Sequence, residues 1–309
     1  MKYSLLLSPL ARTAYFADWQ KIARAELAAC GFEIGSVREV GTFCLVDLEA
    51  DESDLQRLSR LSAVQGVFSR DGESLLPLDV SPGFSLPDNL VFGQKYQGKT
   101  NELVTQLAIN VGLANLQTST RPPVLLDPMA GRGTTLLWAL RYGMNARGIE
   151  VERKNLDLFQ AHVKKQCKLH RISHNGDKGR IGKSKAGGSF QRFEFEGRRV
   201  QLVHGDSAEL LWQEGQKFDL VVSDLPYGIQ HVARDTRNPF SIVEDCAPAW
   251  VAGMRMGAVM VLIFNEYQTH KADLAALFEE QKLEALAFAA PHRMSESIVR
   301  DILVLRKPA

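Results

Sequence analysis

The sequence predicts an α/β protein in which a doubly wound, mostly parallel sheet follows a small α+β domain of ferredoxin-like type. From residue 101 onward, short apolar segments alternate with segments of helical periodicity, a pattern typical of a parallel sheet covered by helices on both faces. Residues 1–76 contain three strand-like segments separated by two helical ones, as expected for a small α+β sandwich. The chain of 309 residues is 45% hydrophobic and 24% charged, which excludes disordered and fibrous proteins.

The first domain, residues 1–76, is predicted from local patterns. Apolar residues repeat at helical spacing from Trp19 to Cys30, and Gly31 ends the repeat. Ser53 can cap a second helix because its hydroxyl accepts a backbone N–H group. The predicted elements are, in order, a strand at 2–8, a helix at 19–30, a strand at 42–48, a helix after Ser53 and a strand at 64–69.

Prolines mark the boundary between the two domains. Pro77, Pro82 and Pro87, with Gly83 among them, interrupt every periodic pattern, because these residues favour turns and extended connections. The sequence therefore predicts a linker over residues 77–92 and a second domain over residues 93–309.

The second domain is predicted to begin with a helix at 101–116, followed by six strands that alternate with helices. The strands are expected within 122–127, 145–152, 200–205, 218–224, 258–266 and 301–308. Doubly wound sheets bind their ligands at the carboxyl ends of the parallel strands. The residues that follow each strand are therefore the first candidates for chemistry.

One segment departs from this alternation and is strongly basic. Residues 171–189 hold five glycines between positions 176 and 188 and almost no apolar side chains, which predicts a mobile, glycine-rich insertion. Residues 164–199 contain 11 Lys and Arg against three Asp and Glu, a local charge of +8, although the whole chain carries only +1. This asymmetry favours a polyanionic partner.

Several other classes are excluded. No apolar run reaches the roughly 18 residues that a membrane helix needs, and the N-terminal residues are too weakly basic for a signal peptide, so we expect a cytoplasmic protein without a membrane partner. The four cysteines form no C-x-x-C pair, and His162, His170 and His174 lack an acid or a cysteine at metal-binding spacing. No metal site is predicted.

A literal P-loop pattern, GQKYQGKT, runs from Gly93 to Thr100, and the segment FDLVVSD is compatible with a strand that ends in a magnesium-binding Asp. A P-loop NTPase is therefore a minor alternative. A working P-loop needs a buried strand directly before its first glycine. Here the preceding segment contains Pro87 and Asp88, which make a poor central strand.

A second glycine motif, DPMAGRGT, spans residues 127–134 after an apolar strand. A dinucleotide-binding turn requires a third glycine, and Leu136 stands in its place. Asp127 would repel a pyrophosphate but suits a ligand that carries ammonium and sulfonium charges, while Gly131 and Gly133 allow the backbone to approach a ligand closely. These features favour S-adenosylmethionine.

Two further acids follow the next strands along the chain. Glu150 lies 23 residues after Asp127, the spacing expected of a carboxylate that binds both ribose hydroxyls. Asp206 follows a later strand and can accept a hydrogen bond from an adenine amino group, with Ser207 beside it. One acid at a strand end is often only a helix cap, but three in order favour a cofactor site.

The third motif, SDLPYG at residues 223–228, follows another apolar strand. An exocyclic base amine is a poor nucleophile because its lone pair is delocalised into the ring. Hydrogen bonds from the amine to the Asp224 carboxylate and the Leu225 carbonyl would direct that pair toward a methyl group, and Pro226 would stiffen the turn. Asp224 can also take the released proton, and Tyr227 offers a ring on which the base stacks. A plain turn is the alternative.

Together these motifs resemble those of the class I S-adenosylmethionine-dependent methyltransferases that modify amino groups, and among them the tRNA guanosine-N2 methyltransferases related to the THUMP-domain proteins. The resemblance covers about residues 90–309 and includes GKT, DPMAGRGT, Glu150, HGDS and DLPYG in the family's order. It implies a Rossmann-like methyltransferase sheet whose last strand, DILVLRK, runs antiparallel. It also places Lys99 and Thr100 beside the methionine end of the cofactor.

The sequence thus predicts a two-domain enzyme that methylates an exocyclic base amine, with guanosine N2 in tRNA favoured. The open alternatives are N6-adenine methylation of RNA or DNA, methylation of a protein glutamine, and an inactive RNA-binding protein. The cofactor-site candidates are Lys99, Thr100, Asp127, Met129, Gly131, Gly133, Thr134, Glu150, Asp206, Ser207 and Asp224. RNA contacts are expected from the N-terminal domain and from Arg171, Lys178, Arg180, Lys183 and Lys185.

Overall fold

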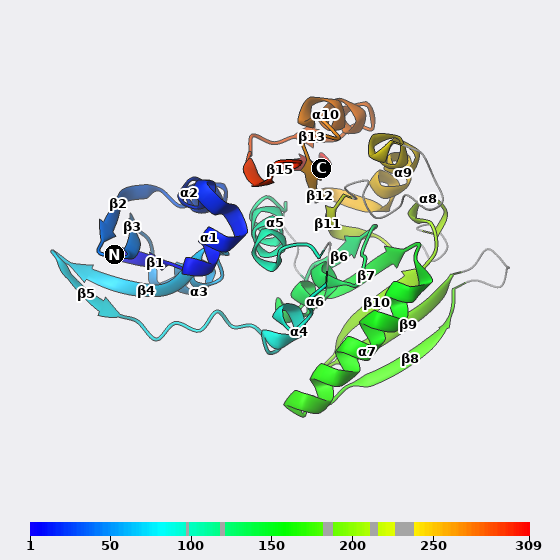
Figure 1. Cartoon of the computed structure of the whole chain (residues 1–309), viewed down its shortest axis with the longest axis horizontal. Helices are drawn as coiled ribbons and strands as arrows, with labels where there is room; N and C mark the ends of the chain where they lie inside the picture. The colour runs from blue at the N-terminus through cyan, green and yellow to red at the C-terminus, as the bar shows by residue number, and fades with distance from the viewer. Residues whose placement is uncertain (97–98, 118–120, 182–187, 211–215, 226–237) are drawn as a thin grey trace.

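The structure is a computed structural model that describes residues 1–96, 99–117, 121–181, 188–210, 216–225 and 238–309. Within these ranges the strands form two sheets, one of five strands and one of ten. Figure 1 shows the N-terminal sheet on the left and the larger sheet, with its helices, on the right.

The N-terminal sheet is antiparallel throughout, with the strand order β2-β3-β1-β4-β5. Its elements are β1 (Lys2–Leu7), α1 (Pro9–Tyr15), the 3₁₀ helix η1 (Phe16–Asp18), α2 (Trp19–Ala29), β2 (Ile34–Val40), β3 (Phe43–Glu49), the 3₁₀ helix η2 (Glu52–Asp54), α3 (Leu55–Ser59), β4 (Val64–Asp71) and β5 (Ser74–Pro77). Without β5, this is the β-α-β-β-α-β order of the split β-α-β pattern.

Two edge strands, helix α1 and one helix start were not predicted correctly. Strands β2 and β5 lie at the two edges of the sheet, and most of their residues are partly or fully exposed, so neither carries the apolar alternation of a buried strand. Ser53 does not cap α3, because it lies inside η2. The predicted linker is also shorter in the structure, since Pro77 ends β5 and α4 (Asn89–Phe92) occupies its last residues.

The larger sheet has five parallel strands at its centre, in the order β12-β11-β6-β7-β10. After α4, its elements are α5 (Glu102–Ala114), β6 (Val124–Asp127), α6 (Thr134–Arg141), β7 (Asn145–Glu150), α7 (Arg153–His170), β8 (Asn175–Arg180), β9 (Ser189–Phe195), β10 (Arg198–His204), α8 (Ser207–Leu210), β11 (Phe218–Asp224), α9 (Pro239–Gly253), β12 (Met254–Asn265), α10 (Lys271–Glu280), β13 (Glu284–Ala285), β14 (His292–Ser295) and β15 (Ile298–Arg306). The last strand, β15, pairs antiparallel with β12, as the resemblance implied.

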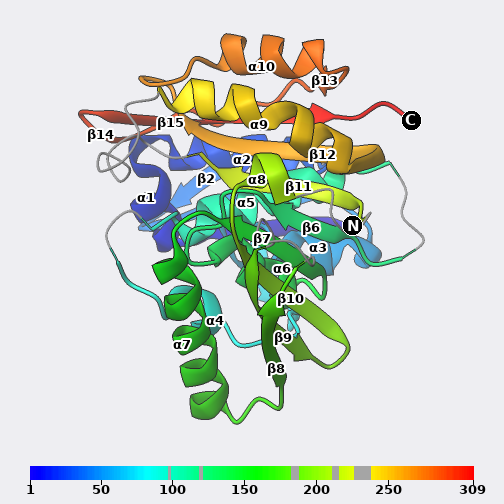
Figure 2. The same cartoon turned by 90° about the vertical axis from the view of Figure 1, so that its right-hand side faces the viewer.

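Helices cover both faces of the large sheet, as the alternating pattern predicted. One core contains Leu125, Leu220 and the buried residues of α5, α6 and α7, whereas the other contains Leu126, Val221 and the buried residues of α9 and α10. Neighbouring residues of one strand point to opposite faces, which explains this division. Figure 2 shows α9 and α10 together on one side of the sheet.

The glycine-rich segment is not simply a loop, because β8 forms a hairpin with β9 and thereby extends the large sheet. Gly176 lies opposite Phe193, and Gly179 lies opposite Phe190. A Cβ atom added to Gly179 would come within 2.9 Å of the Phe190 ring. The glycines therefore leave room for aromatic rings of the opposite strand, a packing partner that glycine counting does not reveal.

The N-terminal half and the C-terminal half, which holds the large sheet, share one hydrophobic core that continues from β1 and α2 through α5 to the large sheet. A buried polar cluster crosses the same interface. The Glu26 carboxylate of α2 accepts hydrogen bonds from the Ser62 backbone N–H group (2.9 Å) and from Asn110 Nδ2 of α5 (2.7 Å). Burial raises the pKa of Glu26. The two halves are therefore packed as one unit, with α5 between them (Figure 1).

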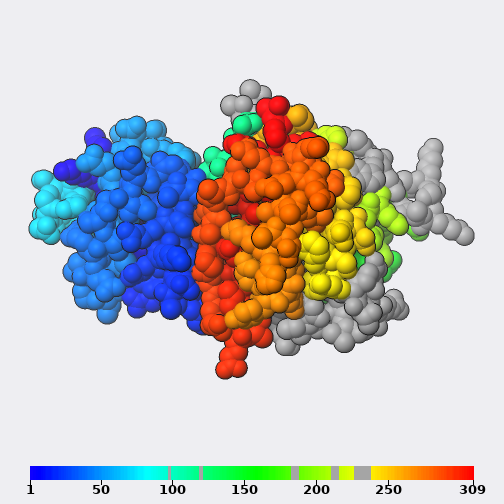
Figure 3. Space-filling model, turned by 90° about the horizontal axis from the view of Figure 1, so that it is seen from above, coloured from blue at the N-terminus to red at the C-terminus, as the bar shows by residue number. Residues whose placement is uncertain are grey.

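The N-terminal half also reaches the carboxyl edge of the large sheet, where α1 and η1 contact β14. Figure 3 shows blue N-terminal residues against red C-terminal ones. Among the described residues, no helix has the length and apolar character needed to cross a membrane.

Candidate active site

The parallel strands bring three predicted acids to one edge of the sheet. Asp127 ends β6, Glu150 ends β7 and Asp224 ends β11, and these strands run side by side in the order β11-β6-β7. Asp206 follows β10, which pairs with β7. Because the carboxyl ends of parallel strands lie at the same edge, acids that are distant in sequence become neighbours in space.

Asp127 is the most deeply buried of these acids, with only 2% of its surface exposed. Its Oδ1 atom accepts hydrogen bonds from Ser223 Oγ (2.8 Å) and from the Met129 backbone N–H group (3.1 Å). Burial raises the pKa of Asp127 to about 7; hydrogen bonds from Ser223 and Thr135 oppose the rise, and the charge of Asp224 adds to it. A cationic ligand beside this carboxylate would favour its ionised form.

Glu150 ties the glycine turn to the end of β7. Its Oε2 atom accepts a hydrogen bond from the Gly131 N–H group (2.8 Å), and its Oε1 atom accepts one from the Glu152 N–H group (2.7 Å). Each carboxylate oxygen has two lone pairs, so both oxygens can also accept a ligand hydroxyl. Glu150 thus keeps acceptor capacity at the end of β7, and its role in binding a ribose stays a prediction.

The turn after β6 depends on its two glycines. Gly131 and Gly133 have φ angles of +52° and +81°, values that disfavour side chains with a Cβ atom. Gly133 precedes Thr134, the first residue of α6, and its Cα lies against the Phe159 ring of α7. Met129 is partly buried and packs against the second core. The turn therefore brings backbone, rather than side chains, close to the strand-end acids.

The P-loop interpretation of residues 93–100 is wrong. The residues before Gly93 form helix α4, not a buried strand. Lys99 Nζ donates hydrogen bonds to the carbonyl oxygens of Val91 and Gln94, both at 2.8 Å, and contacts the Glu102 carboxylate. An ammonium group has three donors, and these three contacts use them. Lys99 therefore links α4 to α5, and the partly buried Thr100 follows it.

Tyr96 belongs to this site, although the sequence analysis did not select it. The Arg132 guanidinium lies 3.9 Å from the centre of its ring, and its side chain hydrogen-bonds Thr134. Burial raises the pKa of Tyr96, and the charges of Asp224 and Glu150 add to that rise. Tyr96 therefore lies among the acids of two strand ends. No local motif marks it; only its place three residues before Lys99 could have drawn attention to it.

Asp206 directly precedes helix α8 and Ser207 is the first residue of that helix, and their side chains have different surroundings. Asp206 is exposed, and its carboxylate accepts a hydrogen bond from the Ala208 N–H group (2.8 Å). Ser207 is buried, and its hydroxyl accepts a hydrogen bond from Trp250 Nε1 (3.0 Å). The Ser207 hydroxyl therefore serves packing between α8 and α9, whereas Asp206 stays accessible.

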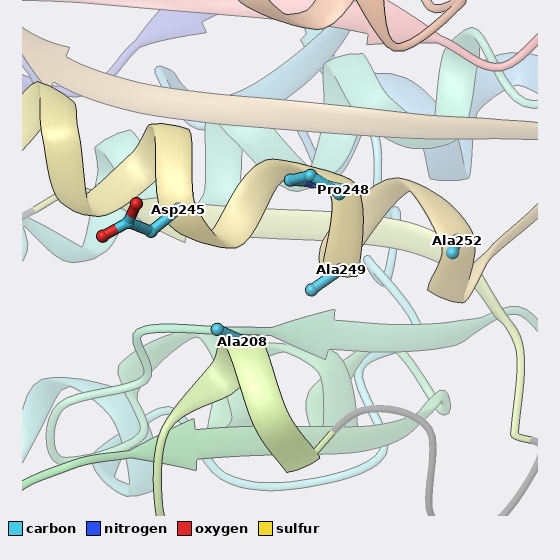
Figure 4. Close-up of a pocket in the computed structure, with 5 residues that line it drawn as sticks. All are labelled: Ala208, Asp245, Pro248, Ala249 and Ala252. Carbon is cyan, nitrogen blue, oxygen red and sulfur yellow. The ribbon is translucent and has the colours of Figure 1, made fainter.

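A shallow hollow of about 300 Å³ lies between α8 and α9, beside this turn. Figure 4 shows the residues that line it, namely Ala208, Asp245, Pro248, Ala249 and Ala252. Most of these side chains are small and apolar. Among the described residues that line the hollow there is no predicted site residue, and Asp206 lies two residues before Ala208 in the chain.

Asp224 and Leu225 are held rigidly at the end of β11. The Leu225 N–H group donates a hydrogen bond to the Ile263 carbonyl of β12 (2.8 Å), and the Leu225 side chain is buried. The Asp224 carboxylate lies 3.4 Å from the Arg300 guanidinium of β15. Pro226 and Tyr227 lie outside the described residues.

The predicted RNA-contacting residues lie on the β8–β9 hairpin and just before it. Arg171 follows α7, and Lys178 and Arg180 lie on β8; all three are exposed. Lys178 and Arg180 are two residues apart on one strand, so they point to the same side. Lys183 and Lys185 lie outside the described residues. Within the described part of the chain, no group of three or more His, Cys, Asp or Glu could hold a metal ion.

Comparison with known proteins identifies a family. The model of the RMKL-like methyltransferase domain matches residues 100–289, which is more than half of the chain. The tRNA (guanine(10)-N(2))-methyltransferase TRMT11 of Bos taurus is 22% identical over 183 residues, or 53% of this chain and 38% of the relative. The same enzyme of Rattus norvegicus is also 22% identical over 183 residues, with 53% and 37% covered. The matched region thus spans about two fifths of the curated relatives.

Among solved structures, a methyltransferase from Pyrococcus furiosus matches with a TM-score of 0.45 and 12% identity, covering 72% of this chain and 92% of that chain. Magnesium protoporphyrin IX methyltransferase from Synechocystis, solved with bound SAM, matches with a TM-score of 0.43 and 14% identity, covering 71% and 88%.

Proposed function

Because the chain belongs to the RMKL-like methyltransferase domain family, we propose that it transfers a methyl group from S-adenosylmethionine to the N2 amine of a guanosine in tRNA. The observation that carries the proposal is the position of Asp224. This acid, which opens the DLPYG segment, ends the strand beside that of Asp127. A base-binding motif and a cationic cofactor site would therefore adjoin each other. The two TRMT11 relatives, which are tRNA (guanine(10)-N(2))-methyltransferases, support guanine N2 as the acceptor.

The proposed cofactor site uses the strand-end acids and the glycine turn. Asp127 would face the positively charged methionine part of the cofactor, Glu150 would accept hydrogen bonds from the ribose hydroxyls, and Asp206 would accept one from the adenine amino group. The backbone at Gly131 would lie against the ligand. When bound, the cofactor supplies an electrophilic methyl group on a sulfonium centre. Burial of Asp127 supports this arrangement, because a buried carboxylate is stabilised by a cationic partner.

The residues that follow β11 would prepare the base. Asp224 and the Leu225 carbonyl would accept hydrogen bonds from the amine and thereby hold it in line with the S–CH₃ bond. The nitrogen would take the methyl group, and the cofactor would leave as S-adenosylhomocysteine. The methylated nitrogen then loses one proton, which Asp224 accepts. Tyr227 would stack on the base, which must be extruded from any helix to reach the site.

The RNA would lie across both halves of the molecule. The exposed basic residues Arg171, Lys178 and Arg180 suit phosphate contacts. The N-terminal sheet, in the role of a ferredoxin-like RNA-binding domain, would hold a more distant part of the tRNA. Contact of α1 and η1 with β14 supports this proposal, because it places the N-terminal half beside the proposed catalytic edge.

The affinity for S-adenosylmethionine is expected to depend on pH through Asp127. The pKa of this carboxyl is about 7 in the folded protein, so lowering the pH protonates it and removes the negative charge that the cationic ligand needs. Affinity should therefore rise about 16-fold between pH 5.5 and pH 7, in proportion to the ionised fraction. Calorimetric titration across this range measures the change. Asp127→Asn should bind more weakly and with no such rise; an unchanged slope in that variant would rule out Asp127 as the titrating group.

The proposed function is tested with unmodified tRNA, transcribed in vitro, and labelled S-adenosylmethionine. After digestion to nucleosides, label in N2-methylguanosine supports the proposal, whereas label in N6-methyladenosine or in protein would assign the acceptor to the alternatives.

Thermal unfolding is compared in parallel with S-adenosylmethionine, S-adenosylhomocysteine and ATP with magnesium, because a ligand at 100 times its Kd stabilises by about 2.7 kcal/mol. Binding of tRNA without methylation of any acceptor would indicate an inactive RNA-binding protein.

A further inference from the structure

An arginine from the antiparallel strand β15 lies against the Asp224 carboxylate. Arg300 Nη2 is 3.4 Å from Asp224 Oδ2, and the two side chains are only 6% and 10% exposed. The contact reaches across one intervening strand, because β12 lies between β11, which carries Asp224, and β15, which carries Arg300. Arg300 can make it because Asn265, its partner on β12, is the last residue of that strand. The guanidinium passes over the end of β12 to the catalytic edge.

The backbone that carries Arg300 is held by the Asn265 side chain. Asn265 Oδ1 accepts hydrogen bonds from the N–H groups of Tyr267 (3.3 Å) and Val299 (3.1 Å), and its Nδ2 atom donates one to the Ser297 carbonyl (3.2 Å). These bonds join the turn after β12 to the start of β15. Arg300 therefore starts from a fixed position, which a long side chain needs if it is to orient another group.

The Tyr15 ring of α1, from the N-terminal half, packs beside the strand that neighbours Arg300. It lies edge-on against the buried His292 ring, with 5.5 Å between the ring centres. His292 in turn pairs with Arg300 across β14 and β15. Burial lowers the pKa of His292, and the charge of Arg300 lowers it further. The Arg300 and Asp224 side chains are thus nearly excluded from water, which strengthens the attraction between their charges.

We infer that Arg300 is a positioning residue that orients the Asp224 carboxylate toward the base amine. The inference rests on the proposed function, because Asp224 is assigned its role there. Its physical basis is the contact at Oδ2: an arginine beside this oxygen restrains where the oxygen lies, and so the direction in which the carboxylate accepts the amine N–H group. Loss of this contact would remove a restraint on the Asp224 carboxylate, and misplacement of a reacting group by about 1 Å can cost about 100-fold in rate.

The experiment compares Arg300→Gln and Arg300→Lys with a matched control on the same strand. Arg306 also lies on β15 and pairs with Glu284 at 2.7 Å, far from Asp224 along the strand. We expect Arg300→Gln to lower kcat about 100-fold, with KM for both substrates unchanged within about twofold. Arg300→Lys should recover part of kcat because it keeps the charge. Arg306→Gln should behave like the wild type.

A crystal structure of Arg300→Gln with S-adenosylhomocysteine provides a readout that does not depend on turnover. The Asp224 carboxylate should change its rotamer or occupy several orientations. An unrotated carboxylate, or an equal loss of kcat in Arg300→Gln and Arg306→Gln, would overturn the inference. If Arg300→Gln fails to fold, Arg300→Lys is measured instead. A changed orientation of the Asp224 carboxylate with a lowered kcat would support the inference, and an unchanged orientation would overturn it. A wild-type enzyme that methylates no RNA would contradict the proposed function, while the crystal structure would still test the contact.

Discussion

Replacing Asp224 with Ala is expected to lower kcat by about 10²-fold to 10⁴-fold, the range for loss of a positioned proton acceptor. The amine would lose the hydrogen bond that directs its lone pair and the group that accepts its proton. Asp224→Asn keeps the shape of the side chain and should lose nearly as much, because an amide is a much weaker proton acceptor. Single-turnover methylation of tRNA, with saturating cofactor, measures the effect on the chemical step.

Asp219 provides the matched control for this substitution. It lies on β11, as Asp224 does, but near the opposite end, where it binds Arg121 (2.8 Å) and the Val124 N–H group (2.8 Å). Asp219→Asn should lower the free energy of unfolding and leave the single-turnover rate of the folded enzyme unchanged. If Asp224→Asn kept more than a tenth of the wild-type rate, Asp224 would not be the acceptor of the proton.

Substitution of Gly133 with Ala is expected to lower the free energy of unfolding by about 2–5 kcal/mol. Two costs combine at this position. The φ angle of +81° strains any residue with a Cβ atom, and the added Cβ would lie 2.7 Å from the ring of Phe159, which is fully buried. The ring can move only by disturbing the packing of α7. Urea unfolding without cofactor measures the change.

Gly131→Ala separates the two costs. Gly131 also has a positive φ angle, +52°, but an added Cβ would meet no atom within 4 Å. This variant should therefore lose only the backbone contribution, about 1–2 kcal/mol. Equal losses in the two variants would show that contact with Phe159 contributes nothing, and that backbone conformation accounts for both glycines.

The strand-end acids were predictable because two local patterns determine them. An apolar segment predicts a buried strand, and the residue that follows it lies at the carboxyl edge. Asp127, Glu150 and Asp224 follow this rule, and the structure places them together. Their roles in binding and chemistry remain predictions.

The same local logic failed where a residue's partner is distant in sequence. Lys99 matches a P-loop, yet its ammonium group binds carbonyl oxygens in and after α4 and the Glu102 carboxylate at the start of α5. Ser207 stands beside a predicted adenine acceptor, yet its hydroxyl binds Trp250. Tyr96 and Arg300 carry no motif at all, because their significance comes from neighbours on other segments. The glycines of β8 indicated a loop because the facing aromatic rings lie on β9.

The sequence by itself determined the α/β class of the large sheet, the existence of a separate N-terminal sheet and the acids at the strand ends, since each depends on spacing along the chain. Only the tertiary structure decided that the two sheets share a core through α5, that Lys99 and Ser207 serve packing, and that Arg300 lies against Asp224. The physical reason is that packing contacts, hydrogen bonds and ion pairs form between residues that are close in space. Spacing along the chain specifies only which residues are neighbours within one helix or strand.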